Sequence, residues 1–194
     1  MADPQTFFGS RAAGWDDKFA DDGPRYEQAV AELGVGPGDV VLDAGCGTGR
    51  ALPVLRTAVG PAGTVLGLDL TAEMLAEARR RGRGGQAALV RADVGRLPLR
   101  TGSLDAVLAA GLVSHLPDPV AGLAELARVA RRGARLALFH PVGRAALARR
   151  HGRKLDLDDL RSEPRIRDTL ARAGWSVTAV DDAADRWLVL AVLG

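Results

Sequence analysis

The feature that most constrains the fold of this chain is a regular alternation of short apolar runs with helical patterns. The apolar runs cover residues 40–42, 65–68, 87–90, 104–109 and 136–139, and between them residues 51–59, 71–82 and 120–131 have helical spacing. Strands that are joined through helices run parallel, because a parallel connection needs a crossover segment. The sequence therefore predicts an α/β fold with a parallel sheet covered on both faces.

The C-terminal part has a different pattern. Residues 166–173 have helical spacing and end at Gly174, residues 175–180 alternate apolar with polar, and residues 187–193 are continuously apolar. A short polar loop over 181–185 makes the last two runs a hairpin, so one of them runs antiparallel to the sheet. We expect a Rossmann-like seven-stranded doubly wound sheet, mostly parallel with an antiparallel C-terminal hairpin, whose apolar last strand lies inside and whose alternating strand forms the edge.

Length and composition bound the classes of protein. The 194 residues fit one domain, with 1–36 as an N-terminal helical cap or lid and 37–194 as the core. The net charge of +2 gives no argument for binding nucleic acid. Two basic clusters are each interpreted as a solvated helix end: Arg79, Arg80, Arg81 and Arg83, then Arg149, Arg150, Arg153 and Lys154.

The first residues, the length of the apolar runs and the cysteine content indicate the compartment. The first residues, MADPQTFF, lack the basic and apolar regions of a signal peptide, and no apolar run approaches the ~20 residues of a membrane span. The single cysteine, Cys46, allows no internal disulfide and is interpreted as a small filler within a turn. We expect a cytoplasmic protein without a membrane span.

The first strand runs into an acid and a glycine turn in the stretch VVLDAGCGTGR, where Asp43 is followed by Gly45, Gly47 and Gly49. Ligands of open α/β sheets bind beyond the carboxyl ends of the strands, and glycines let a ligand lie against bare backbone amides. The dinucleotide pattern G-x-G-x-x-G fails in both registers, since its third glycine would fall on Arg50 or Leu52. An NAD-type oxidoreductase is therefore kept only as a less favoured alternative.

Two further acids follow the next strands. Asp69 ends the second strand and is placed to accept from both hydroxyls of a ribose, while Asp93 follows the third and is placed to accept from an exocyclic amine. Asp43 would repel a pyrophosphate but suits a cationic or hydroxylated ligand. The three acids and the turn describe a ligand with a cationic end, a ribose and an amino-purine, which is the anatomy of S-adenosyl-L-methionine.

Four blocks of the sequence carry a family resemblance: VLDAGCGTG, LGLDLTAEML, RADVGRLPLRTGSLDAVLA and LARVARRGARLALFHP. In order and spacing they resemble the class I S-adenosylmethionine-dependent methyltransferases, most of all the group with the ubiquinone and menaquinone biosynthesis enzymes. The resemblance covers roughly residues 40–139. It departs from the family where a Pro-Gly-Gly turn is expected, since this chain has Arg132-Gly133-Ala134 there.

The resemblance implies a role for each residue of the expected cofactor site. The glycine turn would hold the amino-acid part of the cofactor, and Asp69 would bind the ribose. Leu70, Asp93 and Val94 would contact the adenine. The segment 109–111 would run beside the sulfonium. The implied cofactor residues are Asp43, Gly45, Gly47, Asp69, Leu70, Asp93, Val94 and Ala110.

His115 and His140 follow the fourth and fifth strands and are the candidate catalytic residues. Each is interpreted either as the base that takes a proton from an acceptor or as a structural or substrate-positioning residue. The three histidines and one cysteine show no metal-ligand spacing, so no metal is expected. The aromatic residues Trp15, Phe19 and Tyr26 fit helices over the cofactor mouth, or a simple cap on the core.

The functional hypothesis is methyl transfer to an oxygen, nitrogen or carbon atom of a small-molecule acceptor. A non-catalytic protein that binds S-adenosylmethionine or S-adenosylhomocysteine is the second hypothesis. The expected assembly is a monomer or a homodimer, with no nucleic-acid partner.

Overall fold

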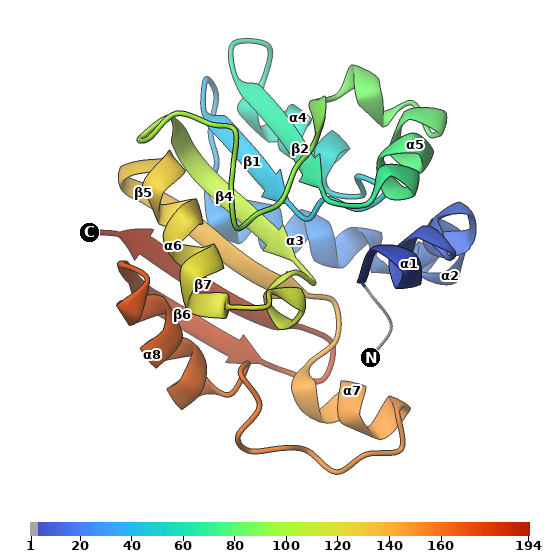
Figure 1. The fold of residues 1–194 in the computed structure, drawn as a ribbon, viewed down its shortest axis with the longest axis vertical. Helices are drawn as coiled ribbons and strands as arrows, with labels where there is room; N and C mark the ends of the chain where they lie inside the picture. Colours follow the sequence, from blue (N-terminus) through green and yellow to red (C-terminus); the bar gives the residue numbers. More distant parts are fainter. Residues whose placement is uncertain (1–3) are drawn as a thin grey trace.

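The computed structural model describes residues 4–194, which form a seven-stranded sheet. Helices cover both faces of this sheet (Figure 1). The strand order is β3-β2-β1-β4-β5-β7-β6. The strands are β1 (Val40–Ala44), β2 (Thr64–Asp69), β3 (Ala88–Arg91), β4 (Leu104–Ala110), β5 (Ala130–His140), β6 (Trp175–Asp182) and β7 (Trp187–Leu193).

The pairing of the strands confirms the expected topology. Strands β1 to β5 pair parallel, whereas β7 pairs antiparallel with both β5 and β6. The continuously apolar β7 lies inside the sheet and the alternating β6 forms its edge, because only an inner strand buries side chains on both faces. From β1 the chain adds β2 and β3 on one side and β4 and β5 on the other, and this reversal of strand order places the end of β1 at the topological switch point.

The two faces of the sheet carry separate cores. Along β1 and β4 successive residues alternate between them: Val41, Ala106 and Leu108 pack with one core, and Leu42 and Val107 with the other. Helices α3 (Gly23–Leu33) and α4 (Leu52–Val59) cover the first face, and α6 (Pro119–Val129) and α8 (Glu163–Arg172) cover the second. Burial on both faces explains why these strands are almost entirely apolar, with Asp43 and Asp105 as their polar residues.

The remaining helices are short. They are α1 (Pro4–Gly9), α2 (Trp15–Lys18), α5 (Ala72–Arg80) and α7 (Arg144–Arg150). Figure 1 shows α1 and α2 beside α5, near the ends of β1 and β2. Across residues 4–194 no helix is both long and apolar enough to cross a membrane.

The junction between α6 and β5 differs from the sequence expectation. We expected a helix to 131 and a strand from 136, but the strand begins at Ala130, directly after the helix. Leu104 pairs with Ala130 and Ala106 with Arg135, so the residues between them bulge out of the ladder. Gly133, with a φ of 76°, lies within this bulge, where a left-handed backbone favours glycine.

Candidate functional site

The glycine turn after β1 is built from backbone conformations that other residues rarely adopt. Gly45, Gly47 and Gly49 have φ angles of 71°, 56° and 80°. A Cβ atom on Gly45 would lie 3.0 Å from Cδ1 of Leu112, so the turn also packs closely against the segment after β4. The N–H of Cys46 donates to the carbonyl of Leu68 at 2.9 Å, which fixes the turn against the end of β2.

Asp69 at the end of β2 joins the turn to the next helix. Its Oδ2 accepts the backbone N–H of Gly47 and its Oδ1 accepts that of Thr71, both at 2.8 Å. Thr71 occupies the N-cap position of α5, but its side chain forms no capping hydrogen bond. The carboxylate of Asp69 instead fixes the start of α5, and the glycine turn with it.

Asp43 at the end of β1 is a buried carboxylate with an unpartnered oxygen. Its strand lies between β2 and β4, the residue is 1% exposed, and Oδ1 has no hydrogen-bond partner among the described residues. Burial, together with the charge of Asp69, raises the pKa of Asp43 to about 7. An orphaned carboxylate oxygen of this kind fits a ligand that brings a cationic hydrogen-bond donor, such as the ammonium group of an amino acid.

The other expected cofactor residues lie along the same edge of the sheet. Leu70 follows β2 and is 40% exposed. Asp93 follows β3 and is exposed, with Oδ1 accepting the N–H of Gly95 at 2.8 Å, and the adjacent Val94 is buried. Ala110 is the last residue of β4. The structure thus brings all eight expected cofactor residues to the carboxyl ends of β1 to β4.

The two histidines lie at the carboxyl ends of the neighbouring strands, His115 after β4 and His140 at the end of β5. His140 is the last residue of β5, and its Nδ1 lies 2.8 Å from the carbonyl oxygen and 3.1 Å from the nitrogen of Val142. His115 ends a 3-10 turn after β4, and its ring meets that of Phe8 edge-on, with centroids 5.0 Å apart. Desolvation lowers the pKa of both imidazoles, and the charge of Arg161 lowers it further. In His140 the hydrogen bond with the backbone of Val142 opposes this shift without cancelling it, so both rings favour the neutral form.

The aromatic residues near the N-terminus divide into two groups. Trp15 contacts Phe8 and Phe19, with ring centroids 5.6 Å and 4.9 Å apart, and so belongs to the segment that also reaches His115. Tyr26 on α3 instead packs on Phe139 of β5, at 5.1 Å. Trp15 therefore belongs to the same aromatic group as Phe8, which touches a candidate site residue, whereas Tyr26 packs against the core.

Sequence reasoning missed a buried acid in this N-terminal segment. Asp16 accepts the hydroxyl of Thr48 at 2.5 Å and forms ion pairs with Arg83 at 2.6 Å and Arg81 at 3.6 Å. The interpretation of Arg81 and Arg83 as part of a solvated helix end is therefore wrong, since both guanidinium groups bind this buried carboxylate. We call Asp16, Thr48, Arg81 and Arg83 the Asp16 cluster. Their separation along the chain left no local pattern that could have revealed it.

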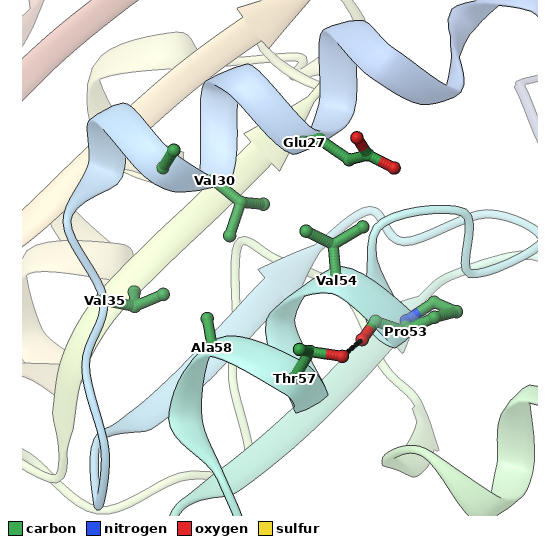
Figure 2. A pocket seen from close by; sticks show the side chains of 8 residues that line it. Glu27, Val30, Val35, Pro53, Val54, Thr57 and Ala58 are labelled. Carbon is green, nitrogen blue, oxygen red and sulfur yellow. Dashed lines mark hydrogen bonds between the residues drawn. The ribbon is translucent and has the colours of Figure 1, made fainter.

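A separate apolar groove lies between α3 and α4 (Figure 2). Its cavity volume is about 470 Å³, and it is lined by Glu27, Val30, Ala31, Val35, Pro53, Val54, Thr57 and Ala58. None of the expected site residues lines it. Over the part of the chain that the structure describes, no three histidine, cysteine or acidic side chains are grouped so that they could hold a metal ion.

The fold is Rossmann-like, and the candidate site lies at its topological switch point. A family model described as "Methyltransferase domain" matches residues 42–138, which is half of the chain. The chain therefore belongs to the methyltransferase domain family, and the predicted resemblance to class I S-adenosylmethionine-dependent methyltransferases is confirmed.

Curated relatives and solved structures agree with this assignment. The chain is 39% identical over 121 residues to a demethylmenaquinone methyltransferase of Mycobacterium sp. (strain JLS), covering 61% of this chain and 50% of the relative. It is 42% identical over 106 residues to an uncharacterized 37.1 kDa protein in a transposon of Streptomyces fradiae, covering 54% of this chain and 31% of the relative. The chain thus spans half or less of the length of these relatives.

Similarity to a solved structure extends over most of both chains. A SAM-dependent methyltransferase from Aquifex aeolicus matches with a TM-score of 0.74 and 28% identity, covering 87% of this chain and 89% of that one. The family and this structure confirm the predicted fold and S-adenosyl-L-methionine as the cofactor.

Proposed function

We propose that this chain transfers the methyl group of S-adenosyl-L-methionine to an oxygen, nitrogen or carbon atom of a small-molecule acceptor. The observation that carries the proposal is the buried, unpartnered oxygen of Asp43 beside Asp69 and the glycine turn. Names of relatives support the class of acceptor, since they include a nocamycin O-methyltransferase of Saccharothrix syringae and an aklanonic acid methyltransferase of a Streptomyces species.

The proposed binding roles follow from the free hydrogen-bonding capacity of each group. Asp43 would receive the ammonium group of the cofactor, which gives its buried carboxylate a cationic partner. Each oxygen of Asp69 already accepts one backbone N–H, and a carboxylate oxygen has a second lone pair for a ribose hydroxyl. Leu70 would pack on the adenine, with Asp93 and the Val94 amide at its edge.

The bound cofactor supplies an activated methyl group and leaves as a neutral thioether. The protein therefore has little charge to stabilise, and its residues mainly position the acceptor and exclude water. The proposed site for the acceptor lies between Ala110, His115, His140 and the N-terminal aromatic residues. If the acceptor must lose a proton, a neutral imidazole can take it; in His140 this would be Nε2, because Nδ1 faces the backbone of Val142.

The proposal also covers the division of the chain into parts, its compartment and its oligomeric state. We assign residues 37–194 to the cofactor-binding core and residues 1–36, of which the structure describes 4–36, to an N-terminal helical cap. Within this cap α3 covers one face of the sheet, and the part before it lies beside α5. We also propose that the protein is cytoplasmic, because its single cysteine fits a reducing compartment. The net charge of +2 fits the absence of a nucleic-acid partner. The proposed assembly is a monomer or a homodimer.

The test combines binding with transfer. We expect S-adenosylhomocysteine to bind to the purified protein in a calorimetric titration, and label from methyl-labelled cofactor to appear in a compound of a small-molecule extract. Binding without any transfer of label would favour the non-catalytic alternative. Absence of binding would contradict the proposed function altogether.

A further inference from the structure

We propose that Asp16 is a positioning residue that couples the N-terminal segment, residues 4–22, to the glycine turn, so that closure of this segment and cofactor binding occur together. The inference rests on the proposed function, because it concerns the same cofactor site. It is carried by the Asp16 cluster, which links three parts of the chain that are distant in sequence.

The carboxylate of Asp16 is buried, and each of its two oxygens has a partner. The residue is 7% exposed; Oδ1 accepts the Thr48 hydroxyl at 2.5 Å, and Oδ2 lies 2.6 Å from the guanidinium of Arg83. Burial alone would raise the pKa of Asp16, but the hydrogen bonds and charges of Arg83, Thr48 and Arg81 outweigh it and lower this pKa. A buried acid that stays ionised through specific partners is costly to leave unpaired, so its geometry is tightly set.

On the core side, the cluster holds the glycine turn at Thr48. Thr48 is 1% exposed, and Arg83 donates to its backbone carbonyl at 2.7 Å while Asp16 binds its hydroxyl. The preceding residue is Gly47, whose N–H donates to Asp69. Thr48 is thus fixed through both side chain and backbone, one residue away from the amide that is tied to the proposed ribose-binding acid.

On the side of the N-terminal segment, packing against α5 is supplemented by polar contacts with the turn. Helix α2 has only four residues, too few to be stable without tertiary contacts. The guanidinium of Arg50, also in the turn, donates to the carbonyl of Phe19 and lies 3.4 Å from Asp22. Since Thr48 and Arg50 lie in the turn and Arg83 binds its backbone, we infer that a change in the turn alters how the segment is held.

The segment also reaches the proposed acceptor side. Trp15, adjacent to Asp16, contacts Phe8, and Phe8 contacts the ring of His115. The Asp16 cluster therefore joins the part of the chain that would cover the acceptor to the part that would hold the cofactor. This arrangement gives a physical reason for closure to follow occupation of the cofactor site.

The experiment compares variants on both sides of the cluster. Asp16→Asn removes the charge that binds Arg83, Thr48→Val removes the hydroxyl, and Thr48→Ser restores it. Asp21→Asn is the matched control, because Asp21 is an exposed acid in the same segment. Calorimetry measures the affinity for S-adenosylhomocysteine, and hydrogen exchange measures the protection of residues 4–22 with and without it.

We expect the ligand to increase the protection of residues 4–22 in the wild type. Asp16→Asn and Thr48→Val should each weaken binding about tenfold and lose this increase, and their double variant should lose less than the sum of the two effects. Thr48→Ser and Asp21→Asn should behave like the wild type.

The inference is overturned if Asp16→Asn and Thr48→Val lower the thermal stability but bind the ligand with wild-type affinity and protection, since their role is then structural only. If Asp16→Asn does not fold, Thr48→Val and Thr48→Ser are compared instead. Equal ligand affinity and equal protection of residues 4–22 in these two variants would overturn the inference. A wild-type protein that binds the ligand without added protection of residues 4–22 overturns the inference and leaves the proposed function standing. A wild type that does not bind at all removes both.

Discussion

Asp69 accepts the backbone N–H of Gly47 at 2.8 Å, which joins the end of β2 to the middle of the glycine turn that follows β1. Its second oxygen accepts the N–H of Thr71 at the start of α5. A single carboxylate therefore organises two loops that carry most of the proposed cofactor contacts. Asp69 therefore has a structural role in this region, in addition to its proposed role as the partner of the ribose.

Replacement of Asp69 should reduce cofactor affinity strongly. Asp69→Ala removes the acceptor of two backbone N–H groups and the proposed partner of the ribose, so we expect S-adenosylhomocysteine to bind at least about tenfold more weakly. Asp168→Ala is the control, because Asp168 is an exposed acid on α8 whose one ion pair is at the surface. Calorimetry on both variants checks the expectation, and equal affinities would show that Asp69 does not contact the ligand.

The affinity for the ligand should depend on pH through Asp43. The ligand-free pKa is about 7, and a cationic partner favours the ionised carboxylate, so binding should strengthen as pH rises toward 7 and then level off. Below this value the affinity should fall by up to about tenfold per pH unit, because Asp43 must release its proton when the ligand binds. Titration across this range in two buffers of different ionisation enthalpy measures the effect.

Asp43→Asn provides the control for this pH dependence. Its affinity should be weaker than that of the wild type and nearly constant across the same range. The folded pKa of Asp43 lies above its unfolded value of 3.8, so the contribution of this group to stability is fully present below about 3.8 and lost as pH rises through about 7. Asp43→Asn should therefore gain stability relative to the wild type as pH rises, by about 2 kcal/mol between pH 5.5 and 8.

The close approach of Gly45 to Leu112 can be separated from its backbone conformation. Gly45→Ala and Gly102→Ala both place a side chain at a positive φ, 71° and 66°, which costs about 1–2 kcal/mol. Only at position 45 would the added Cβ also meet a neighbour, at 3.0 Å from Leu112. Urea denaturation should show the larger loss for Gly45→Ala, and only this variant should weaken ligand binding; the opposite order would contradict the tight packing of the turn.

The histidines can be distinguished by their pH–rate profiles once an acceptor is known from the labelled-methyl screen. If the acceptor loses a proton, we expect the variant of the true base, His115→Asn or His140→Asn, to lower kcat by about 10²–10⁴ and to lose the acidic limb of the profile. The other variant should change mainly KM. Retention of the wild-type kcat and acidic limb by both variants would show that neither imidazole takes the proton.

Much of this architecture was predictable because its signals are local. The strands β1 and β4 are buried on both faces and read as apolar runs, and the acids Asp43 and Asp69 stand directly after such runs. Since the carboxyl ends of parallel strands share one edge, their convergence followed from topology. The hairpin of β6 and β7 was likewise visible from the contrast between an alternating and a continuous apolar run.

What the sequence did not reveal depends on contacts between distant residues. Asp16 and Arg83 look like solvated charges until the chain brings them together around Thr48. The early start of β5 depends on pairing of Ala130 with Leu104, which no pattern within residues 130–135 indicates. Both are tertiary effects that override the local reading of the sequence.

The most direct test of the account is a calorimetric titration of the wild-type protein with S-adenosylhomocysteine, run beside an identical titration with NADH. The account predicts one binding site for S-adenosylhomocysteine and no heat of binding with NADH. Saturable binding of NADH with no response to S-adenosylhomocysteine would contradict it.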